Sequence, residues 1–248
     1  MSKSIHVFGF HSIESLLESN PESILKVIIQ SNRKDKRAND LIHSLTSHKI
    51  STSNTDKNNL DRIAKGESHQ GVISEVILPP LLNEESLYKY VNSNTLKPLI
   101  LILDSIQDPR NLGACLRSAN AAGVDYVVIN KDGSAPINSL VHKTSAGAIN
   151  SLKIFHVTNL SRTIKDMQKR GIWVIGLDGD SKSTIYDVNL TDATAIVMGA
   201  EGKGIRRLIK ETCDQIVTIP MSGNIESLNV SVATGIALFE SKRQRETT

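Results

Sequence analysis

Three stretches of the chain place polar side chains where an apolar run ends and a helix is about to begin. The apolar runs are Leu99–Asp104, Thr194–Val197 and Ile216–Ile219. The polar side chains that follow them are two amides, a guanidinium, a carboxylate and a hydroxyl: Asn111, Asn229, Arg117, Glu201 and Ser227. Such a set can align a nucleophile and stabilise developing charge. The sequence has no Gly-x-Ser-x-Gly elbow, no His-Glu-x-x-His pair and no Asp-rich metal cage, so no metal is expected.

Each of these residues also has an ordinary structural explanation. Ser227 and Asn229 are typical helix N-caps, and Glu201 could be a negative charge that stabilises a helix N-terminus. Arg117 could be a surface charge, but small and apolar neighbours predict that its helix is substantially buried. A buried guanidinium needs a partner, and phosphate suits its planar fork.

The stretch Met198–Gly204, MGAEGKG, is rich in glycine and lies between a strand and a helix. Its G-x-x-G-x-G spacing differs from the G-x-G-x-x-G of dinucleotide sites and lacks the Lys and Ser/Thr of a P-loop. Glycines at such a place let the backbone approach a flat ligand closely, or they serve the loop conformation alone. The spacing therefore disfavours a nucleotide-dependent oxidoreductase.

The elements around these stretches predict an α/β fold. The run Leu99–Leu103 is apolar at every position, which is typical of a strand buried on both faces of a mainly parallel sheet. Similar runs alternate with helical patterns as far as a last helix that ends near Arg243. That helix has small or apolar residues nearly all round, which predicts a buried helix, and Gly235 in its interior predicts very close packing. The predicted runs are Tyr126–Ile129, Ile172–Leu177, Ala195–Met198 and Ile216–Ile219, and the predicted helices are Leu112–Ala122, Leu160–Lys169 and Ile205–Glu211.

A smaller α/β unit precedes this domain. Its predicted strands are Val7–Gly9, Ile24–Ile29 and Val72–Leu78, and its predicted helices are His11–Glu18, Asp35–Ser47 and Leu60–Lys65. Pro79-Pro80 ends the unit. We therefore expect a domain at residues 1–78, a linker at 79–97 and a second domain at 98–248.

Composition sets few limits on the partner. The formal net charge of +3 permits a nucleic-acid partner without demanding one. Three clusters of basic residues could either contact RNA phosphates or be ordinary solvated surface. The first follows Gly202, the second ends the chain and the third lies in the N-terminal unit: Lys203, Arg206, Arg207 and Lys210; Lys242, Arg243 and Arg245; Arg33, Lys34, Lys36 and Arg37. Two isolated cysteines and the absence of a signal peptide or membrane span lead us to expect a cytoplasmic protein without a membrane partner.

The three motifs together resemble the SpoU/TrmH branch of the SPOUT methyltransferases over about residues 98–245. The resemblance implies a deep trefoil knot, a homodimer paired through the last helix, and S-adenosylmethionine bound largely by backbone groups at Gly199, Ile219 and Leu228. It assigns catalysis to Asn111, Arg117, Glu201, Ser227 and Asn229, with Asn111 supporting Arg117.

The opening HVFGFHSIESLL and the stretch HQGV at 69–72 resemble the N-terminal RNA-binding domain of the RlmB subgroup of this family, a ribosomal-protein-like α/β domain. The resemblance implies 2′-O-methylation of a guanosine ribose in 23S ribosomal RNA, free or in an assembling large subunit. A tRNA ribose methyltransferase is an alternative that residues 1–78 disfavour. A non-catalytic ribosome-assembly protein is another, and it predicts the loss of Arg117, Glu201 or Asn229, all of which are present.

Overall fold

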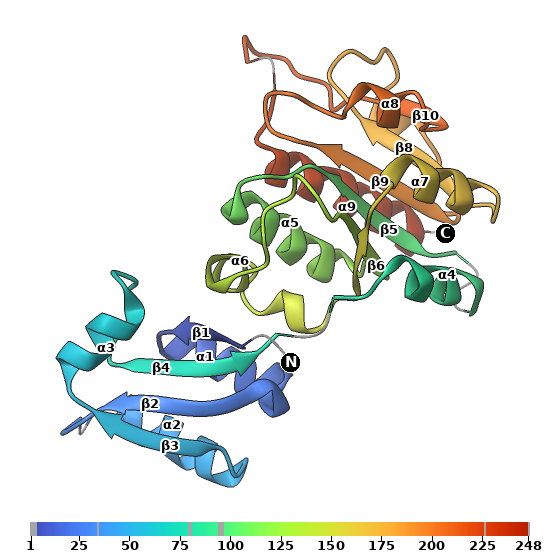
Figure 1. Ribbon diagram of the computed structural model, residues 1–248. Coiled ribbons are helices and arrows are strands. Elements are labelled where there is room, and N and C mark those ends of the chain that lie inside the picture. The colour runs from blue at the N-terminus through green and yellow to red at the C-terminus, as the bar shows by residue number, and fades with distance from the viewer. Residues whose placement is uncertain (1–3, 34, 79–80, 94–96, 226, 248) are drawn as a thin grey trace. The chain divides into compact units, whose positions relative to one another are not determined.

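The computed structural model describes residues 4–33, 35–78, 81–93, 97–225 and 227–247. Contacts divide the chain into two compact units, each described here by itself (Figure 1). The first contains Met1–Pro80 together with Ile137–Ser151, and the second contains Leu81–Pro136 and Leu152–Thr248. The segment 137–151 thus differs from the expected arrangement, which placed it within a domain at 98–248. Lys34 and Pro79-Pro80 lie outside the described residues.

The first unit is a mixed four-stranded sheet in the order β1-β4-β2-β3. Helices α1 and α2 bury apolar side chains such as Ile13, Leu16 and Leu41 against Val27 and Val72 of the sheet. Strand β3, with the polar sequence STSNT, pairs parallel to β2 at the sheet edge and was not predicted. The elements are β1 Ser4–Phe8, α1 Phe10–Ser19, β2 Ile24–Gln30, α2 Lys36–Ser47, β3 Ser51–Thr55, α3 Lys57–Ala64 and β4 Val72–Ile77.

The segment 137–151 completes this unit. It forms α6 (Ser139–Thr144) and a short 3-10 turn at Ala148–Asn150, and α6 contacts β1. Lys143 of α6 donates to Glu67 across 3.0 Å. His142 is buried, and burial lowers its pKa to about 4, so the imidazole is neutral at physiological pH.

The second unit is a six-stranded sheet in the order β10-β8-β9-β5-β6-β7, and every neighbouring pair is parallel. All six residues of β5 are buried, as its unbroken apolar sequence predicts. The α/β class with a mainly parallel sheet is therefore confirmed. The strands are β5 Leu99–Asp104, β6 Tyr126–Asn130, β7 Ile154–Val157, β8 Trp173–Leu177, β9 Thr194–Gly199 and β10 Gln215–Val217; β7 was not predicted.

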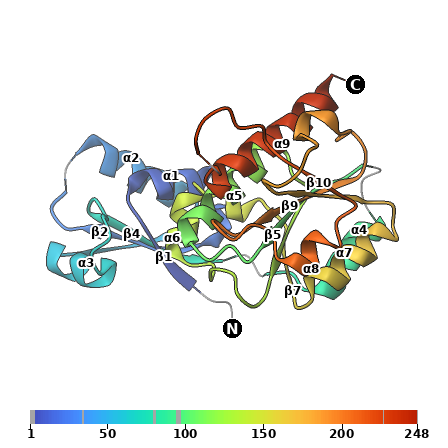
Figure 2. The same ribbon diagram turned by 90° about the horizontal axis from the view of Figure 1, so that it is seen from above.

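Helices cover both faces of this sheet. Figure 2 shows α5 (Pro109–Ala122) and α9 (Val230–Glu246) on one face, and α4 (Glu84–Ser93), α7 (Leu160–Gln168) and α8 (Arg207–Lys210) on the other. Helix α4 lies in the expected linker 79–97. Its Leu87 is fully buried in the core of the second unit, and Leu82 just before it pairs with Phe155 of β7. Residues 81–93 are therefore part of the second unit because they bury apolar surface there.

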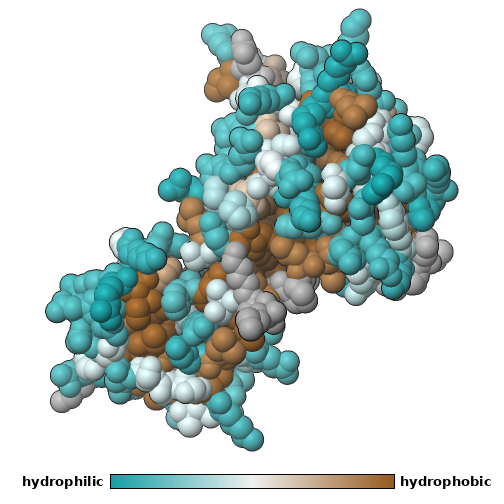
Figure 3. Space-filling view, in the orientation of Figure 1, coloured by the Kyte–Doolittle hydropathy of each residue, from teal (hydrophilic) through white to brown (hydrophobic). Residues whose placement is uncertain are grey.

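Helix α9 is not buried all round, contrary to its predicted character. It packs against α5, but Val232 and Phe239 are 49% and 48% exposed. A side chain added at Gly235 would meet Ser118 Oγ at 3.6 Å, an ordinary contact, so packing within the chain does not demand glycine there. The face drawn in Figure 3 is largely hydrophilic, with apolar residues in separate patches. No helix in the described part of the chain is long and apolar enough to cross a membrane.

Candidate active site at the carboxyl edge of the six-stranded sheet

The carboxyl ends of β5 and β9 lie side by side, with Asp104 paired with Gly199. The chain leaves β5 toward α5 and leaves β9 toward α8, so both loops start from the same edge of the sheet. Ligands of open parallel sheets bind outside this edge. Asn111 lies in the first turn of α5, and Glu201 follows β9 by two residues.

Three of the predicted residues meet in one hydrogen-bonded group. Asn111 Nδ2 donates to Glu201 Oε2 across 2.7 Å, and Asn229 Nδ2 lies 3.0 Å from Asn111 Oδ1 and 3.4 Å from Glu201 Oε1. These residues are 28 to 118 positions apart in sequence. Amide donors on both carboxylate oxygens hold Glu201 in one orientation, and charge-assisted bonds of this kind are stronger than neutral ones.

Asn229 also fixes this group to α9. Its Oδ1 accepts from the backbone N–H of Ser231 at 2.9 Å and from Ser231 Oγ at 2.6 Å, the geometry of a helix N-cap. Capping and participation in the site are therefore two functions of one side chain, since its oxygen serves the helix and its nitrogen serves Asn111 and Glu201. These hydrogen bonds connect the first turn of α5, the loop after β9 and the start of α9.

Arg117 does not join this group, and the expectation of a buried guanidinium is wrong. Arg117 is exposed, and it makes no hydrogen bond or ion pair with any residue that the structure describes. Six residues of helix separate it from Asn111, which turns the two side chains roughly 120° apart around α5. Within one chain, Asn111 therefore supports Glu201 and not Arg117. The buried face of α5 instead consists of Leu112, Cys115, Leu116 and Ala119.

A cavity of about 560 Å³ lies beside Glu201. The predicted residues Ile219, Ser227 and Leu228 line it. The other lining residues come from the ends of β8 and β9, the loops after β8, β9 and β10, and the start of α9: Leu177, Asp178, Gly179, Asp180, Met198, Ala200, Gly202, Lys203, Gly204, Thr218, Pro220, Met221, Val230 and Ala233. Its size is within the usual range of small-molecule sites, which join apolar walls with a few polar groups.

Gly199 is buried and is not among the residues that line the cavity, so its role in cofactor binding stays a prediction. A Cβ at this position would lie 2.0 to 2.2 Å from backbone atoms of Gly204 and Ile205. The loop folds back here, since Gly204 N–H donates to Ala200 O at 2.9 Å. Gly199 thus permits the backbone of Gly204 and Ile205 to approach closely.

The loop along the other side of the cavity keeps its backbone donors free. Within the described residues, no backbone N–H of 219–225 or 227–229 is bonded to another backbone oxygen. Unpaired donors beside a cavity with Leu and Ile walls suit a flat heterocycle with ring nitrogens. Ile219 and Leu228 thus fit the expected mode of S-adenosylmethionine binding, through backbone groups and apolar contact. No group of three or more His, Cys, Asp or Glu lies together among the described residues.

Most basic side chains near this edge are paired within the chain, contrary to their expected use on RNA phosphates. Arg206 Nε lies 2.7 Å from Oδ1 of the fully buried Asp104, and Lys210 Nζ lies 2.8 Å from Asp178 Oδ1. Arg207 pairs with Glu211 at 2.7 Å in a largely exposed position. Lys203, which lines the cavity, has no carboxylate partner among the described residues. Asp104 and Asp178 were missed because a single acid at a strand end carries no distinctive sequence signal.

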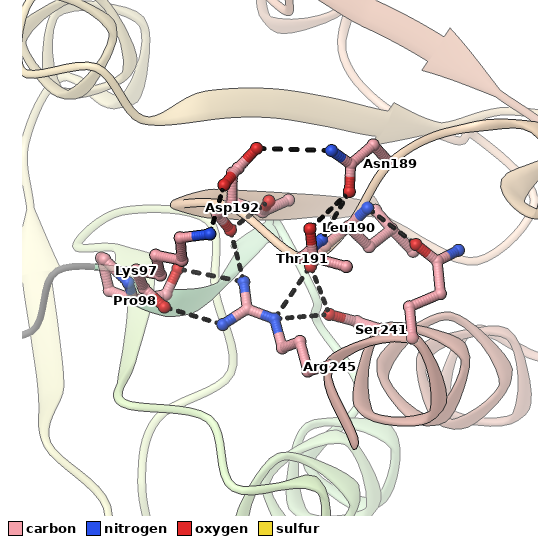
Figure 4. Close-up of polar contacts among 10 residues, drawn as sticks. Lys97, Pro98, Asn189, Leu190, Thr191, Asp192, Ser241 and Arg245 are labelled. Carbon is pink, nitrogen blue, oxygen red and sulfur yellow. Dashed lines mark hydrogen bonds and ion pairs between the residues drawn. The ribbon is translucent and has the colours of Figure 1, made fainter. Parts of the chain in front are cut away.

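The basic residues at the end of α9 are paired as well. Figure 4 shows the Arg245 guanidinium surrounded by backbone carbonyls: those of Lys97 at 2.7 Å, Leu190 at 2.8 Å, Asp192 at 2.6 Å and Pro98 at 3.4 Å. Burial lowers the Arg245 pKa from its ordinary value. Arg243 pairs with Glu240 at 2.7 Å and Lys242 with Glu246 at 3.7 Å. Arg245 is therefore a structural anchor and not a phosphate ligand.

The N-terminal basic cluster is also largely engaged. Arg37 forms two bonds to Glu14, at 2.9 and 2.6 Å, and Arg33 bonds Asp35 and the carbonyl of Gln70. Both guanidinium groups lie over the Phe10 ring, 4.6 and 5.1 Å from its centre. Lys36 is exposed. The cluster thus supports the fold of the first unit, and Lys36 is its described member most open to a partner.

The comparisons with known proteins agree with this arrangement. A model described as the SpoU rRNA Methylase family matches residues 98–239, and one described as RNA 2′-O ribose methyltransferase substrate binding matches residues 6–80. Similar proteins are named 23S rRNA (guanosine-2′-O-)-methyltransferase RlmB. That from Haemophilus influenzae is 46% identical over 98% of both chains. That from Escherichia coli (strain K12) is 45% identical over 96% of this chain and 98% of its own.

Solved structures share the fold. A crystal structure of an RNA 2′-O ribose methyltransferase matches with a TM-score of 0.80 and 25% identity over 99% of this chain and 90% of its own. The SpoU methyltransferase AviRb from Streptomyces viridochromogenes, in complex with the cofactor AdoMet, matches with a TM-score of 0.79 over 99% of this chain and 92% of its own. At 21% identity this second likeness shows the fold alone. By its sequence over residues 98–239 and by its fold, the chain belongs to the SpoU rRNA Methylase family.

Proposed function

We propose that this chain is an S-adenosylmethionine-dependent enzyme that methylates the ribose 2′-oxygen of a guanosine in 23S ribosomal RNA. Relatives that bear this name match nearly its whole length, including the first unit. The observation that carries the proposal is the Asn111–Glu201–Asn229 group beside a cavity with free backbone donors. We place the reaction in the cytoplasm, where bacterial ribosomal RNA is made.

In this proposal the side chains of the site position the ribose and accept the proton of its 2′-hydroxyl. S-adenosylmethionine, when bound, supplies an electrophilic methyl group. Glu201, held by two amides, presents a fixed carboxylate that can accept a hydrogen bond from the 2′-hydroxyl and then its proton, or can pass it to water. Ser227, which lines the cavity, hydrogen-bonds the cofactor or the ribose in this proposal. The Arg117 guanidinium stabilises negative charge on the 2′-oxygen and on the adjoining phosphate.

A homodimer would explain the position of Arg117. Arg117 is exposed on α5 beside the half-buried Ala114 and Ser118, and the neighbouring α9 exposes Val232 and Phe239. Together they form a surface of small and apolar residues that pairing would cover. Arg117 on that surface would then serve the site of the second chain, which completes the predicted catalytic set. The trefoil knot implied by the family stays a prediction.

The oligomeric state is open to direct measurement. Light scattering at micromolar concentration should give twice the 27.1 kDa of one chain. Phe239→Asp should give monomers that still bind S-adenosylmethionine, because Phe239 does not line the cavity. A wild-type monomer at these concentrations would contradict the dimer.

The activity is tested with purified full-length chain and methyl-labelled S-adenosylmethionine. We expect label in 23S ribosomal RNA, at the ribose of a guanosine, and none in a transcript that carries 2′-deoxyguanosine at that position. Label in tRNA and not in ribosomal RNA would favour the tRNA alternative. RNA binding without transfer under any condition would favour the non-catalytic assembly protein.

A further inference from the structure

A second cavity, of about 660 Å³, lies at the opposite edge of the six-stranded sheet. The amino ends of β8, β9 and β10 line it through Trp173, Thr194 and Gln215, and the segment before β9 and the residue before Pro98 close its other sides. It is distinct from the cavity beside Glu201 because β9 spans six residues between the two edges, roughly 20 Å. The remaining lining residues are Lys97, Gly171, Asp187, Val188, Asn189, Asp192 and Ala193.

Trp173 gives this cavity a flat aromatic wall. It is the chain's single tryptophan, in a sequence with only 4% aromatic residues, and it is 49% exposed. The backbone N–H of Trp173 bonds to Ala193 O at 2.9 Å, so the strand that carries the indole is fixed. An exposed indole face on a rigid strand suits a stacked planar ring, and bases stack on aromatic side chains without a large conformational cost.

The polar lining provides both acceptors and a free amide. Hydrogen bonding from Thr184 lowers the pKa of Asp187, and Lys97 lowers the pKa of Asp192, so both carboxylates are ionised at neutral pH. Asp187 uses Oδ2 for Thr184, while its Oδ1 accepts from no described residue. The Gln215 side chain has no hydrogen-bond partner among the described residues. A ligand can therefore find an anionic acceptor and an amide beside the ring.

The wall that carries these groups is rigid. Asn189 and Lys97 both hold the Asp192 carboxylate, at 3.3 and 2.8 Å, and Arg245 holds the backbone carbonyl of Asp192 from the other side (Figure 4). Thr194 Oγ1 donates to the same carbonyl at 2.8 Å. The cavity is thus formed in the free chain, which reduces the entropy that a ligand must overcome.

We propose that this cavity binds an unstacked guanine base. The indole stacks on the purine, Asp187 Oδ1 accepts from the N1–H and N2–H donors of the Watson–Crick edge, and the Gln215 amide bonds the remaining edge. Adenine presents an acceptor at N1 and is repelled by a carboxylate. The distance from Glu201 means that this base is not the one methylated in the same subunit. Its source is either a second guanosine of the RNA, which rests on the proposed function, or a free guanine nucleotide.

Trp173 emission reports on this cavity directly because no other tryptophan contributes. We titrate the full chain, saturated with S-adenosylhomocysteine to block the other cavity, with guanosine and adenosine 5′-monophosphate. Guanosine monophosphate should quench the emission, and adenosine monophosphate should need at least about fivefold more to do so. No quenching by either, or equal quenching by both, overturns the proposal. Quenching by an arginine-rich peptide and not by guanosine monophosphate overturns it in favour of a protein contact.

Variants separate the two sources. Trp173→Ala should weaken binding of a ribosomal RNA fragment about tenfold, Trp173→Phe should recover part of the loss, and Tyr186→Ala, which removes a 51% exposed aromatic outside the cavity, should change nothing. If guanosine monophosphate quenches but Trp173→Ala leaves RNA affinity unchanged, the ligand is the free nucleotide. Methyl transfer is measured in parallel, so quenching without transfer retains this site while the proposed function fails.

Discussion

The two edges of the six-stranded sheet use polar groups in opposite ways. At the amino edge, Arg245 directs its guanidinium at backbone carbonyls from two segments, and Lys97 pairs with Asp192. At the carboxyl edge, loop 219–225 keeps its described backbone donors unpaired and Lys203 has no described carboxylate partner. The difference teaches that the amino edge holds the end of α9 in place, while the carboxyl edge reserves hydrogen-bonding capacity for ligands.

The carboxyl edge also contains self-bonded side chains, among them the Arg206–Asp104 pair and the group of Asn111, Glu201 and Asn229. That group connects the first turn of α5, the loop after β9 and the N-cap of α9. Rigid side chains beside a loop with free donors are the arrangement expected of a site that positions one substrate and closes around another.

The comparison is tested most strongly at Arg117, a cation without a partner among the described residues, on the helix that begins at the carboxyl edge. Arg117→Ala should lower methyl transfer by at least about 10²–10³-fold, the effect of losing a group that stabilises transition-state charge. S-adenosylmethionine should still bind, by calorimetry. Arg117→Lys should stay partly active because a positive charge remains.

Turnover of Arg117→Ala close to wild type would reject the catalytic assignment. A folded Arg117→Lys that binds both substrates but is fully inactive would instead show that the geometry of the guanidinium fork, or proton abstraction, is required.

Two substitutions at Asn229 separate its cap from its part in the site. Asn229→Asp keeps an oxygen for the Ser231 N–H, so the midpoint of urea unfolding should change little. It removes the amide donor and places a second carboxylate beside Glu201, so methyl transfer should fall about 10²-fold, as for a misplaced catalytic group. Asn229→Ala should lose activity and also about 1 kcal/mol of unfolding free energy. Full activity of Asn229→Asp would show that the Asn229 amide donor is not needed for methyl transfer.

At the amino edge we expect a loss of stability with little direct loss of chemistry. Arg245→Met should lower the unfolding free energy by about 2–3 kcal/mol, because four backbone carbonyls, two of them partly buried, lose a charged donor. Arg207→Met is the matched control, since the Arg207–Glu211 pair is exposed and should contribute less than about 1 kcal/mol. Urea unfolding followed by Trp173 emission measures both. Equal effects of the two substitutions would contradict the role of Arg245 as an anchor.

The smallest effect is expected at Lys203. Lys203→Ala should weaken RNA binding only a few-fold and reduce the slope of log affinity against log salt by about 1, the result of losing one phosphate contact. Arg206→Ala is unsuitable as a comparison because it would leave Asp104 buried without its partner. Arg207→Ala serves as the control, and its salt slope should be unchanged.

The sequence predicted most of the strands that bury apolar residues, although it missed β7, and it also missed the polar strand β3. The run Leu99–Leu103 has one explanation, a strand buried on both faces, and it forms β5. Strand β3, with the sequence STSNT, is polar and exposed, so it has no apolar pattern to detect. Segment 137–151 lies within the expected domain 98–248 but groups with the first unit by its contacts, because which surface a short helix covers depends on tertiary contacts.

The site was predicted in its polar members but not in how they are used. Asn111, Glu201 and Asn229 were expected near one another from the order of three loops, and the structure brings them together. The roles of Arg117, Gly199 and Arg245 depend on how these residues are oriented in the folded chain. What matters is the face of α5 on which the Arg117 guanidinium lies, the backbone that packs on Gly199 and the carbonyls that surround Arg245. Spacing along a sequence does not contain those directions.

The central claim is that the carboxyl-edge site methylates a guanosine ribose in 23S ribosomal RNA. It is tested most directly by mapping 2′-O-methylation across 23S ribosomal RNA from cells that contain the wild-type chain, lack it, or contain Arg117→Ala. We predict one guanosine that is methylated with the wild-type chain and unmethylated in the other two samples. Identical methylation in all three samples would contradict the account.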